Sequence, residues 1–394
     1  MMVKSYKYRI YPTTSQELLF KKTFGCTRVY WNALVDEFKS GVKDENYKYT
    51  TSKEIREKFP WIKEISATAL QQKRKDFEEV KKQYFSVTRK TKIKQIKHKN
   101  KKSKQSYRLT NQKFRFIEGK IYIEKVGKVK VKIHREIPEH SKFLSLTIIR
   151  TLQNQYYIIV NFEYNNKIKQ KVSNTNVGID LGISSIATLS DGVQFSNLSK
   201  IIDNQDKIRT AQKHLSRKIK GSQRWLKQKK KLGKLHNKMV NQKMWYLHNI
   251  SRWIVENYNE ISMEDLCIKD MLKNKNISYL NSITPMGKLK ELIIYKQKEY
   301  GKEVFLYPRF EPSTKKCSSC GNIQPMKLID RIFNCKKCDL IEDRDVNAAI
   351  NIKQAIGVNV ALNERGEAIR PIPSQIEWRQ SSMKRLSYKD KNLI

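Results

Sequence analysis

The sequence of 394 residues has no uninterrupted apolar run of about 18 residues, the length that a helix needs to cross a bilayer. Its first residues, MMVKSYKYRIYP, lack the apolar core of a signal peptide. Cysteine is scarce, with six residues, of which Cys26 and Cys267 fit no pairing pattern. This usage is typical of a reducing compartment, where disulfides are rare. We therefore expect a cytoplasmic protein with no membrane partner.

Acidic residues are also few. The chain has 38 Asp plus Glu against 81 Lys plus Arg, which gives a formal net charge of +43. Such a chain repels itself unless a polyanion neutralises it, and nucleic acid is the obvious polyanion. A membrane surface is the alternative, which the missing apolar segments disfavour. The length indicates about two to four domains.

The remaining cysteines form two CxxC pairs, CSSC and CKKC, separated by fourteen residues. This spacing suits one tetrahedral zinc site, because each pair occupies a tight turn and supplies two thiolates. Gly321 follows the first pair, where a turn with positive φ is useful. Two structural disulfides are the alternative. The predicted zinc ligands are Cys317, Cys320, Cys335 and Cys338.

Carboxylates end two apolar strands and begin one helix. Asp180 lies in NVGIDLG, Glu264 lies in EISMEDL, and Asp343 and Asp345 lead the helical segment DVNAAINI. The order Asp, Glu, Asp at the ends of elements is what a two-metal phosphodiesterase site needs, because Mg²⁺ prefers oxygen ligands. Each acid taken alone is weak support for a metal site, because ordinary helix capping would also explain Asp343 and Asp345.

The segments GIDLG, ISMEDL, the cysteine pairs and DRDVNAAINI together resemble the split RuvC nuclease of the TnpB family. TnpB proteins are transposon-encoded, RNA-guided DNA endonucleases related to the type V CRISPR effectors. The resemblance extends to YKYRIYPTTSQ, FGCTRVYWNAL and FPWIKEISATALQQ, and so covers roughly residues 3–355. One departure is LNSITPMGKLKEL, where the family usually has a small-residue and tryptophan element.

The resemblance implies that Asp180, Glu264 and Asp345 hold two Mg²⁺ ions and cleave phosphodiester bonds, leaving a 3′ hydroxyl. It favours Asp345 over Asp343, because the family's third acid precedes an x-Asn-Ala sequence; Asp343 could cap the helix or assist a ligand. The zinc would be structural, since four thiolates leave no open position.

The implied partners are a guide RNA derived from the transposon and double-stranded target DNA. The guide pairs with the target, and the protein reads only a short flanking motif. A monomer associated with the prokaryotic nucleoid is expected. Two alternatives stay open: a nuclease-inactive RNA-guided repressor, which should have lost acids that are present here, and a DNA-strand-transferring transposase.

Apolar periodicity predicts an α+β multidomain fold. Period-two segments after residue 105 predict a β-barrel or sandwich, which we expect the strand at residues 3–11 to join. Helices within 14–85, with capping pairs Thr14/Glu17 and Thr51/Glu54, would then be inserted between its strands.

In the TnpB family this arrangement is a wedge β-barrel split by a helical recognition domain and followed by an RNase H-like (RuvC) nuclease with an inserted zinc ribbon. The expected domains are 1–12 and 106–166 (wedge), 13–105 (recognition, ending in a lysine-rich loop), 175–310 and 340–356 (RuvC), 311–339 (zinc finger) and 357–394 (a disordered tail).

Within the nuclease, Asp191-Gly192 predicts a hairpin after the Asp180 strand. Helices are expected at about 199–231, 236–258 and 286–300, and a strand at 303–307. The first two helices are rich in Lys and Arg, which we interpret as the lining of a nucleic-acid channel, while their tryptophans, Trp225, Trp245 and Trp253, are expected in the core.

Polar side chains on the helix at 66–85 are candidates for reading the flanking motif. Gln pairs bidentately with adenine, and Lys donates hydrogen bonds to guanine or to phosphate. A polar face that touches only phosphate or water is the alternative. The candidate nucleic-acid contacts are Gln71, Gln72, Lys75, Asn111, Arg217, Arg224 and Lys227.

Overall fold

The structure is a computed structural model that describes residues 2–40, 49–86, 95–101, 105–151, 153–165, 174–196, 199–265, 285–308, 311–327 and 330–356. The chain forms two compact units, one of residues 1–168 and 204–240 and one of residues 169–203 and 241–394. The predicted tail at 357–394, Cys267 and most of the lysine-rich loop lie outside the described residues. No helix in the described ranges is long and apolar enough to cross a membrane.

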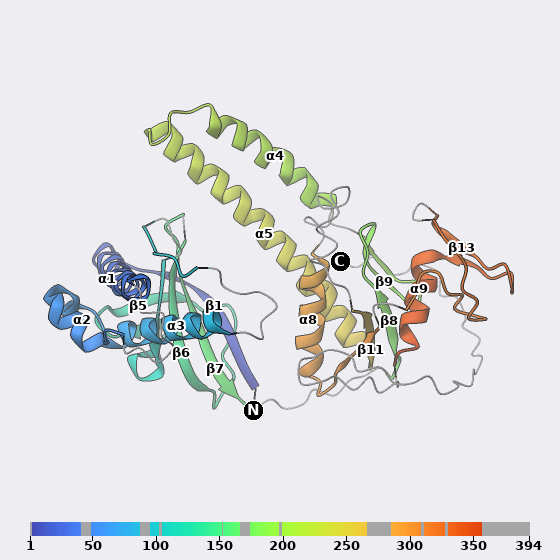
Figure 1. The fold of residues 1–394 in the computed structure, drawn as a ribbon, viewed down its shortest axis with the longest axis horizontal. Helices are drawn as coiled ribbons and strands as arrows, with labels where there is room; N and C mark the ends of the chain where they lie inside the picture. Colours follow the sequence, from blue (N-terminus) through green and yellow to red (C-terminus); the bar gives the residue numbers. More distant parts are fainter. Residues whose placement is uncertain are drawn as a thin grey trace. The chain divides into compact units, whose positions relative to one another are not determined.

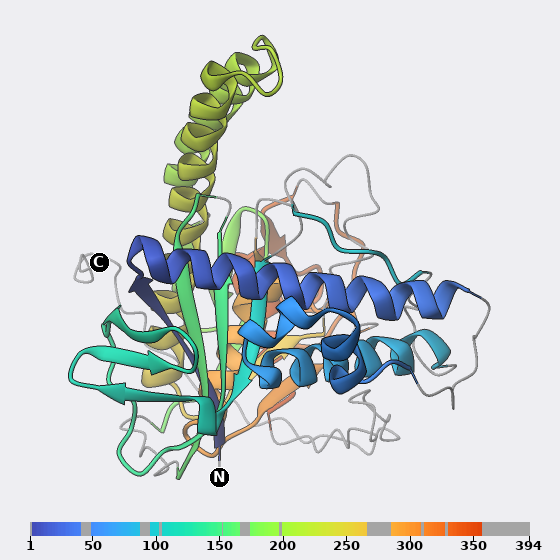
Figure 2. The same ribbon diagram turned by 90° about the vertical axis from the view of Figure 1, so that its left-hand side faces the viewer.

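A seven-stranded antiparallel sheet, barrel-like in its curvature, forms the centre of the first unit (Figure 2). Its order is β2-β6-β7-β1-β5-β4-β3. The amino-terminal strand β1 lies between β7 and β5, as predicted for residues 3–11. The strands are β1 (Met2–Tyr11), β2 (Gln105–Thr110), β3 (Phe114–Ile117), β4 (Lys120–Ile123), β5 (Gly127–Lys132), β6 (Lys142–Arg150) and β7 (Tyr156–Tyr164).

Alternation in these strands buries one face. Along β7 every second residue is buried, from Tyr156 to Tyr164, as expected for a sheet with one covered face. The helices α1 (Thr14–Lys39) and α3 (Ala67–Phe85) cover that face (Figure 2), and Phe20 of α1 packs its ring 5.6 Å from that of Tyr156. The short helices α2 (Ser52–Lys58) and η1 (Pro60–Glu64) lie between them in the chain, and η2 (Asn111–Lys113) follows β2.

The helix caps confirm one prediction and correct another. Thr51 and Glu54 form the predicted capping box of α2. In α1 the box is Thr13 with Gln16, one residue before the predicted pair, and Gln16 Nε2 also donates to the Lys128 carbonyl at 2.9 Å. Both pairs match the capping pattern in sequence, and this added contact with β5 favours the earlier one.

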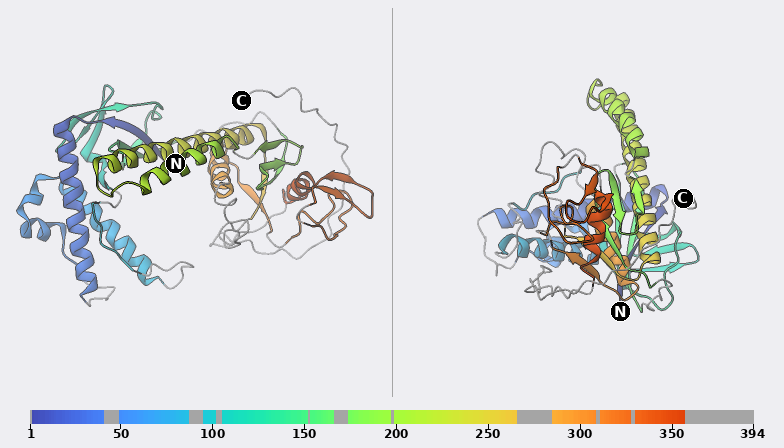
Figure 3. Two further views of the ribbon diagram at one scale, coloured as in Figure 1. Left: turned by 90° about the horizontal axis from the view of Figure 1, so that it is seen from above. Right: turned by 90° about the vertical axis from the view of Figure 1, so that its right-hand side faces the viewer.

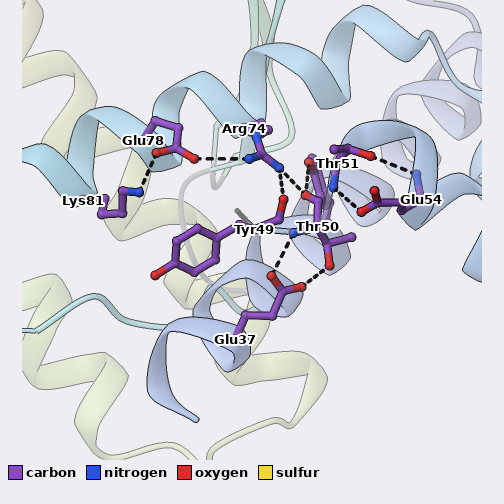
Figure 4. Close-up of polar contacts among 9 residues, drawn as sticks. Glu37, Tyr49, Thr50, Thr51, Glu54, Arg74, Glu78 and Lys81 are labelled. Atoms are coloured by element: carbon purple, nitrogen blue, oxygen red, sulfur yellow. Dashed lines mark hydrogen bonds and ion pairs between the residues drawn. The ribbon is translucent and has the colours of Figure 1, made fainter. Parts of the chain in front are cut away.

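Several basic side chains of α3 form hydrogen bonds and ion pairs within the first unit. Arg74 Nη1 donates to the Tyr49 and Thr50 carbonyls at 2.5 Å, and Glu37 of α1 accepts from the Thr50 backbone and hydroxyl (Figure 4). Two lysines of α3 are buried beside carboxylates: Lys73 lies 2.8 Å from Asp76, and Lys81 lies 3.1 Å from Glu78. Their internal carboxylates compensate the desolvation of these ammonium groups.

The second unit has a five-stranded sheet of order β10-β9-β8-β11-β12. β8 is central, and the Asp191-Gly192 hairpin joins β9 to β10 as predicted. β11 is parallel to β8 and β12. The strands are β8 (Val177–Asp180), β9 (Ser185–Leu189), β10 (Gln194–Ser196), β11 (Ile261–Glu264) and β12 (Val304–Tyr307).

Three helices pack on this sheet (Figure 1). Apolar residues of α5 (Gln223–Asn257) and α8 (Met286–Lys298) share one core with Val177, Ile179, Ile261 and Met263. The opposite face carries α9 (Arg344–Lys353), which follows the small hairpin of β13 (Ile332–Asn334) and β14 (Ile341–Asp343).

The helix α4 (Ser199–Ser216) and α5 run antiparallel (Figure 3). The predicted break at 232–235 is wrong, because the chain turns at 217–222. Gly221 has φ +95°, and Ser222 Oγ accepts from the Trp225 amide at 3.1 Å, which caps α5. Gly233 lies inside the helix, where a glycine is tolerated. The core prediction holds for Trp253, which contacts Phe195, but Trp245 is 61% exposed.

Candidate active site and metal centre

Asp180 and Glu264 end neighbouring parallel strands. Met263 pairs with Ile179 in the β8–β11 register, so the two acids occupy the next position on each strand. Because side chains alternate across a strand, the buried Val177, Ile179, Ile261 and Met263 face α5 and α8. Gly178, Asp180 and Glu264 therefore belong to the opposite face, on which α9 packs.

The third acid comes from the start of α9. Gly178 lets this helix approach β8 closely: a Cβ at residue 178 would lie 2.1 Å from the Ala349 carbonyl oxygen and 2.4 Å from the Lys353 nitrogen. Asp343 is the N-cap, and its Oδ1 accepts from the amides of Asp345 and Val346 at 2.9 and 3.1 Å. The Asp343 carboxylate is thus occupied by the helix terminus, whereas Asp345 projects from the first turn.

The Asp180 carboxyl is buried and is affected by the charges of the other two acids. Burial, with the negative charges of Asp345 and Glu264, raises the pKa of Asp180 to about 7. Arg344 opposes this effect; its guanidinium lies 3.0 Å from Asp345 Oδ1. Asp265, beside Glu264, pairs instead with Lys290 at 2.9 Å. A cation bound by the three acids would reduce the repulsion between their negative charges.

The three acids are spread more widely than the four cysteines. Within the described residues, only the cysteines form a group whose ligand atoms all lie within 4.8 Å of one another, so the carboxylates are more widely spread. Carboxylate oxygens are the ligands that hard cations such as Mg²⁺ prefer.

The four predicted cysteines form one cluster. Cys317 Sγ lies 3.6 Å from Cys338 Sγ, and Cys320 Sγ lies 3.6 Å from Cys335 Sγ. These distances exclude disulfides, whose sulfurs are about 2.05 Å apart. They match the edge of about 3.8 Å of a tetrahedron with zinc–sulfur bonds of ~2.3 Å. The cluster could therefore hold one zinc ion.

Each CxxC pair has the same turn geometry. The amide of Gly321 donates to the Cys317 carbonyl at 3.1 Å, and that of Asp339 donates to the Cys335 carbonyl at 3.2 Å. Gly321 has φ +74°, as predicted, and Asp339 has φ +54°. The Lys337 amide donates to Cys335 Sγ and lowers the pKa of this thiol to about 6, which favours the thiolate that zinc binds.

The basic candidates lie on the α4–α5 pair. Arg224 and Lys227 line a depression of 590 Å³ together with Lys218 and further lysines of α5. Arg217 is exposed in the turn that precedes α5. Positive charges around a depression can contact phosphates.

The candidate motif readers are placed on two elements. On α3, Gln71 and Lys75 are exposed and Gln72 is half-buried, while Asn111 is exposed just after β2. An ion pair of 2.7 Å between Arg108 of β2 and Asp76 of α3 joins these elements. No contact between Asn111 and the glutamines is seen among the described side chains.

Sequence reasoning missed three residues around α9: Arg344, Asn347 and Asn351. Asn347 and Asn351 are fully buried and bond to the backbone near Cys317. The only signal was their helical spacing of four residues, which places polar side chains on one face of a helix that is otherwise rich in apolar residues.

Comparisons with protein families match three parts of the chain. Residues 158–275 match a family described as "Probable transposase" (OrfB of IS605), residues 287–352 match "Cas12f1-like, TNB domain", and residues 1–46 match a "Helix-turn-helix domain" of the same OrfB group. Together they cover more than half of the chain. In the structure, the described part of residues 1–46 is β1 followed by α1.

Relatives match over nearly the whole chain. A "Putative RNA-guided DNA endonuclease" of Streptomyces pristinaespiralis is 27% identical over 97% of this chain and 95% of its own length. The protein "Putative RNA-guided DNA endonuclease InsQ" of Escherichia coli K12 is also 27% identical, over 95% of this chain and 97% of its own. The "CRISPR-associated endodeoxyribonuclease Cas12f1" of Sulfoacidibacillus thermotolerans is 26% identical over 51% of this chain and 50% of its own. The chain is therefore similar to OrfB proteins and to relatives named RNA-guided DNA endonucleases over nearly its whole length.

Proposed function

We propose that this protein is a transposon-encoded, RNA-guided DNA endonuclease that cuts target DNA next to a short flanking motif. The main observation that supports this proposal concerns three acids on one face of the second unit's sheet. They are Asp180 of β8, Glu264 of β11 and Asp345 of α9. The names of the full-length relatives support the same activity. The presence of all three acids favours a nuclease over an inactive RNA-guided repressor.

The three carboxylates would hold two Mg²⁺ ions, which supply activation of an attacking water and stabilisation of the leaving oxygen. Asp180 and Glu264 are fixed by the hydrogen-bonded ends of parallel strands, and Asp345 by a capped helix. Arg344 orients Asp345 through its 3.0 Å contact and limits charge repulsion within the cluster. Holding ligands on rigid elements reduces the reorganisation that metal binding requires.

The remaining assignments follow from the family. The four cysteines would bind one structural zinc, the seven-stranded sheet would be the wedge domain, and the helices within 13–105 the recognition domain. The second unit's sheet would be the RNase H-like core. A transposon-derived guide RNA and double-stranded DNA would be the partners, with phosphates contacting Arg217, Arg224 and Lys227, and with Gln71, Gln72, Lys75 and Asn111 near the flanking motif.

The test is cleavage of a target plasmid by protein purified with its own RNA. Asp180→Ala, Glu264→Ala and Asp345→Ala should each abolish cleavage and leave binding of RNA and target DNA unchanged, because the phosphate contacts are untouched. Asp343→Ala is the matched control, because it removes a helix cap worth about 1 kcal/mol of stability but no proposed ligand.

Three outcomes would each refute a part of this proposal. Full activity of Asp345→Ala with loss in Asp343→Ala would move the third ligand to Asp343. Binding without cleavage by the unaltered protein, in Mg²⁺ or Mn²⁺, would favour the repressor. Joining of DNA ends to a second DNA, rather than release of cut ends, would favour a strand-transferring transposase.

A further inference from the structure

The buried asparagines of α9 contact the backbone on both sides of Cys317. Asn347 Nδ2 donates to the Lys316 carbonyl at 2.8 Å, and Asn347 Oδ1 accepts from the Ser318 amide at 2.9 Å. The side chain is fully buried, as is Cys317. The Asn347 carboxamide thus forms a donor and an acceptor bond with the backbone around Cys317, much as a neighbouring strand would. This backbone segment, Ser313 to Ser318, is called the cysteine turn below. A hydrophobic side chain of the same size could not replace either bond.

Asn351, one helical turn later, adds two donors to the same turn. Its Nδ2 bonds to the Ser313 carbonyl at 2.8 Å and to the Lys316 carbonyl at 2.7 Å. Two carbonyl partners require the NH₂ group, so the orientation of this amide is fixed. Within the described part of the chain, Asn351 Oδ1 is buried without a hydrogen-bond partner. A buried oxygen without a hydrogen bond lowers the stability of the folded protein. The two bonds from Nδ2 to the cysteine turn offset this loss of stability.

Arg344 connects α9 to the segment before the second cysteine pair. Its Nη1 donates to the Asp330 carbonyl at 2.9 Å, its Nε donates to Asp345 Oδ1 at 3.0 Å, and its amide donates to the Arg331 carbonyl at 2.8 Å. One side chain therefore contacts both the proposed zinc ribbon and a proposed magnesium ligand. The asparagines and Arg344 hold α9 against the ribbon at two separate places.

We propose that Asn347 and Asn351 are positioning residues that couple zinc occupancy of the cysteine cluster to metal binding by Asp180, Glu264 and Asp345. This inference rests on the proposed function, because it takes both metal sites from it. Zinc fixes the carbonyls and amides around Cys317, these fix α9, and α9 fixes Asp345. Coupling of this kind is reciprocal, so Mg²⁺ at the carboxylates strengthens zinc binding by the same factor.

The first measurement needs no variant. The Mg²⁺ affinity of the full-length protein, with its co-purifying RNA removed, is determined by calorimetry before and after zinc is withdrawn with a chelator. Zinc removal should weaken Mg²⁺ binding about 10-fold, the lower end of what supporting residues around metal sites contribute. Equal Mg²⁺ affinities in the two states would overturn the proposal.

The second measurement locates the coupling. Asn347→Leu, which keeps a similar volume, should show the weaker Mg²⁺ affinity even when zinc is bound, and zinc removal should then change it no further. Asn351→Leu should act in the same direction and serves if the first variant does not fold. Ile352→Val is the matched control, because it removes a buried methyl group from α9 without touching the cysteine turn.

The outcomes separate the two proposals. Retained 10-fold coupling in both asparagine variants, or its equal loss in Ile352→Val, would show that the asparagines do not transmit it. Absence of Mg²⁺ binding by the zinc-loaded unaltered protein would instead contradict the proposed active site, and the coupling would fall with it. Nuclease activity is not needed for any of these readouts.

Discussion

Gly178 lies in the central strand β8 directly beneath α9, and the structure leaves no room there for a methyl group. A Cβ would be 2.1 Å from the Ala349 carbonyl oxygen, 2.4 Å from the Lys353 nitrogen and 2.8 Å from its Cα. All three atoms are backbone, so no side chain can rotate away. Reaching an ordinary contact of about 3.4 Å requires a shift of α9 by roughly 1 Å, in a core that resists deformation.

Gly178→Ala should therefore destabilise the protein by about 1–3 kcal/mol, the usual cost of overpacking. Because Asp345 is on α9, the same shift moves a proposed metal ligand. A misplacement of about 1 Å costs on the order of 10²-fold in rate. Urea unfolding would measure the first effect and single-turnover plasmid cleavage at saturating Mg²⁺ the second.

Gly25→Ala is the control for this experiment. Gly25 lies inside α1, and a Cβ there would meet nothing within 4 Å. Replacing it should leave cleavage unchanged and stabilise the protein by about 0.5–1 kcal/mol, since glycine is a poor helix former. Wild-type stability and cleavage in Gly178→Ala would refute the close packing of α9 on β8.

Three further predictions concern charge, zinc and specificity. Asp180→Asn should abolish cleavage yet raise the stability of the zinc-loaded, magnesium-free protein by about 1–3 kcal/mol at pH 8, because each pKa unit of unfavourable charge corresponds to ~1.4 kcal/mol. Since the folded pKa is raised from 3.8 to about 7, this gain should shrink as the pH falls from 8 to 6; a gain in unfolding free energy that does not change with pH would contradict it. Cys335→Ser should lower zinc content, stability and cleavage together, and unchanged zinc by metal analysis would exclude the cysteine site. Gln72→Ala and Lys75→Ala should change the motif accepted in a cleavage screen of randomised flanking sequences, whereas uniform weakening of all targets would identify them as phosphate contacts.

The sequence was informative where the signal is local. Apolar runs that end in acids identified β8 and β11, the spacing of the cysteine pairs predicted their clustering, and the period of two in residues 3–11 predicted a strand of the first sheet. Each of these depends on alternation or turn geometry within about ten residues.

Partners distant in the chain could not be predicted in this way. The helical pattern of α3 does not indicate that Lys73 is buried, because its burial depends on the fold around the helix, where Asp76 compensates its charge. The break between the two basic helices was expected at 232–235, yet it lies at 217–222, where Gly221 supplies the positive φ of the turn. Asn347 matched a motif, but no pattern indicates that its amide bonds to the residues beside a cysteine 30 positions earlier.

The carboxylates from β8, β11 and α9 are spread along the chain, and under the proposed function this sets when the protein becomes active during its synthesis. Domains fold as the chain emerges, amino-terminal part first, so the amino-terminal sheet and helices of the first unit would form and bind nucleic acid while residue 345 is still untranslated. Until α9 docks on β8, such a nascent chain would lack the third proposed metal ligand. A ribosome-bound or prematurely terminated product would then hold nucleic acid without cutting it.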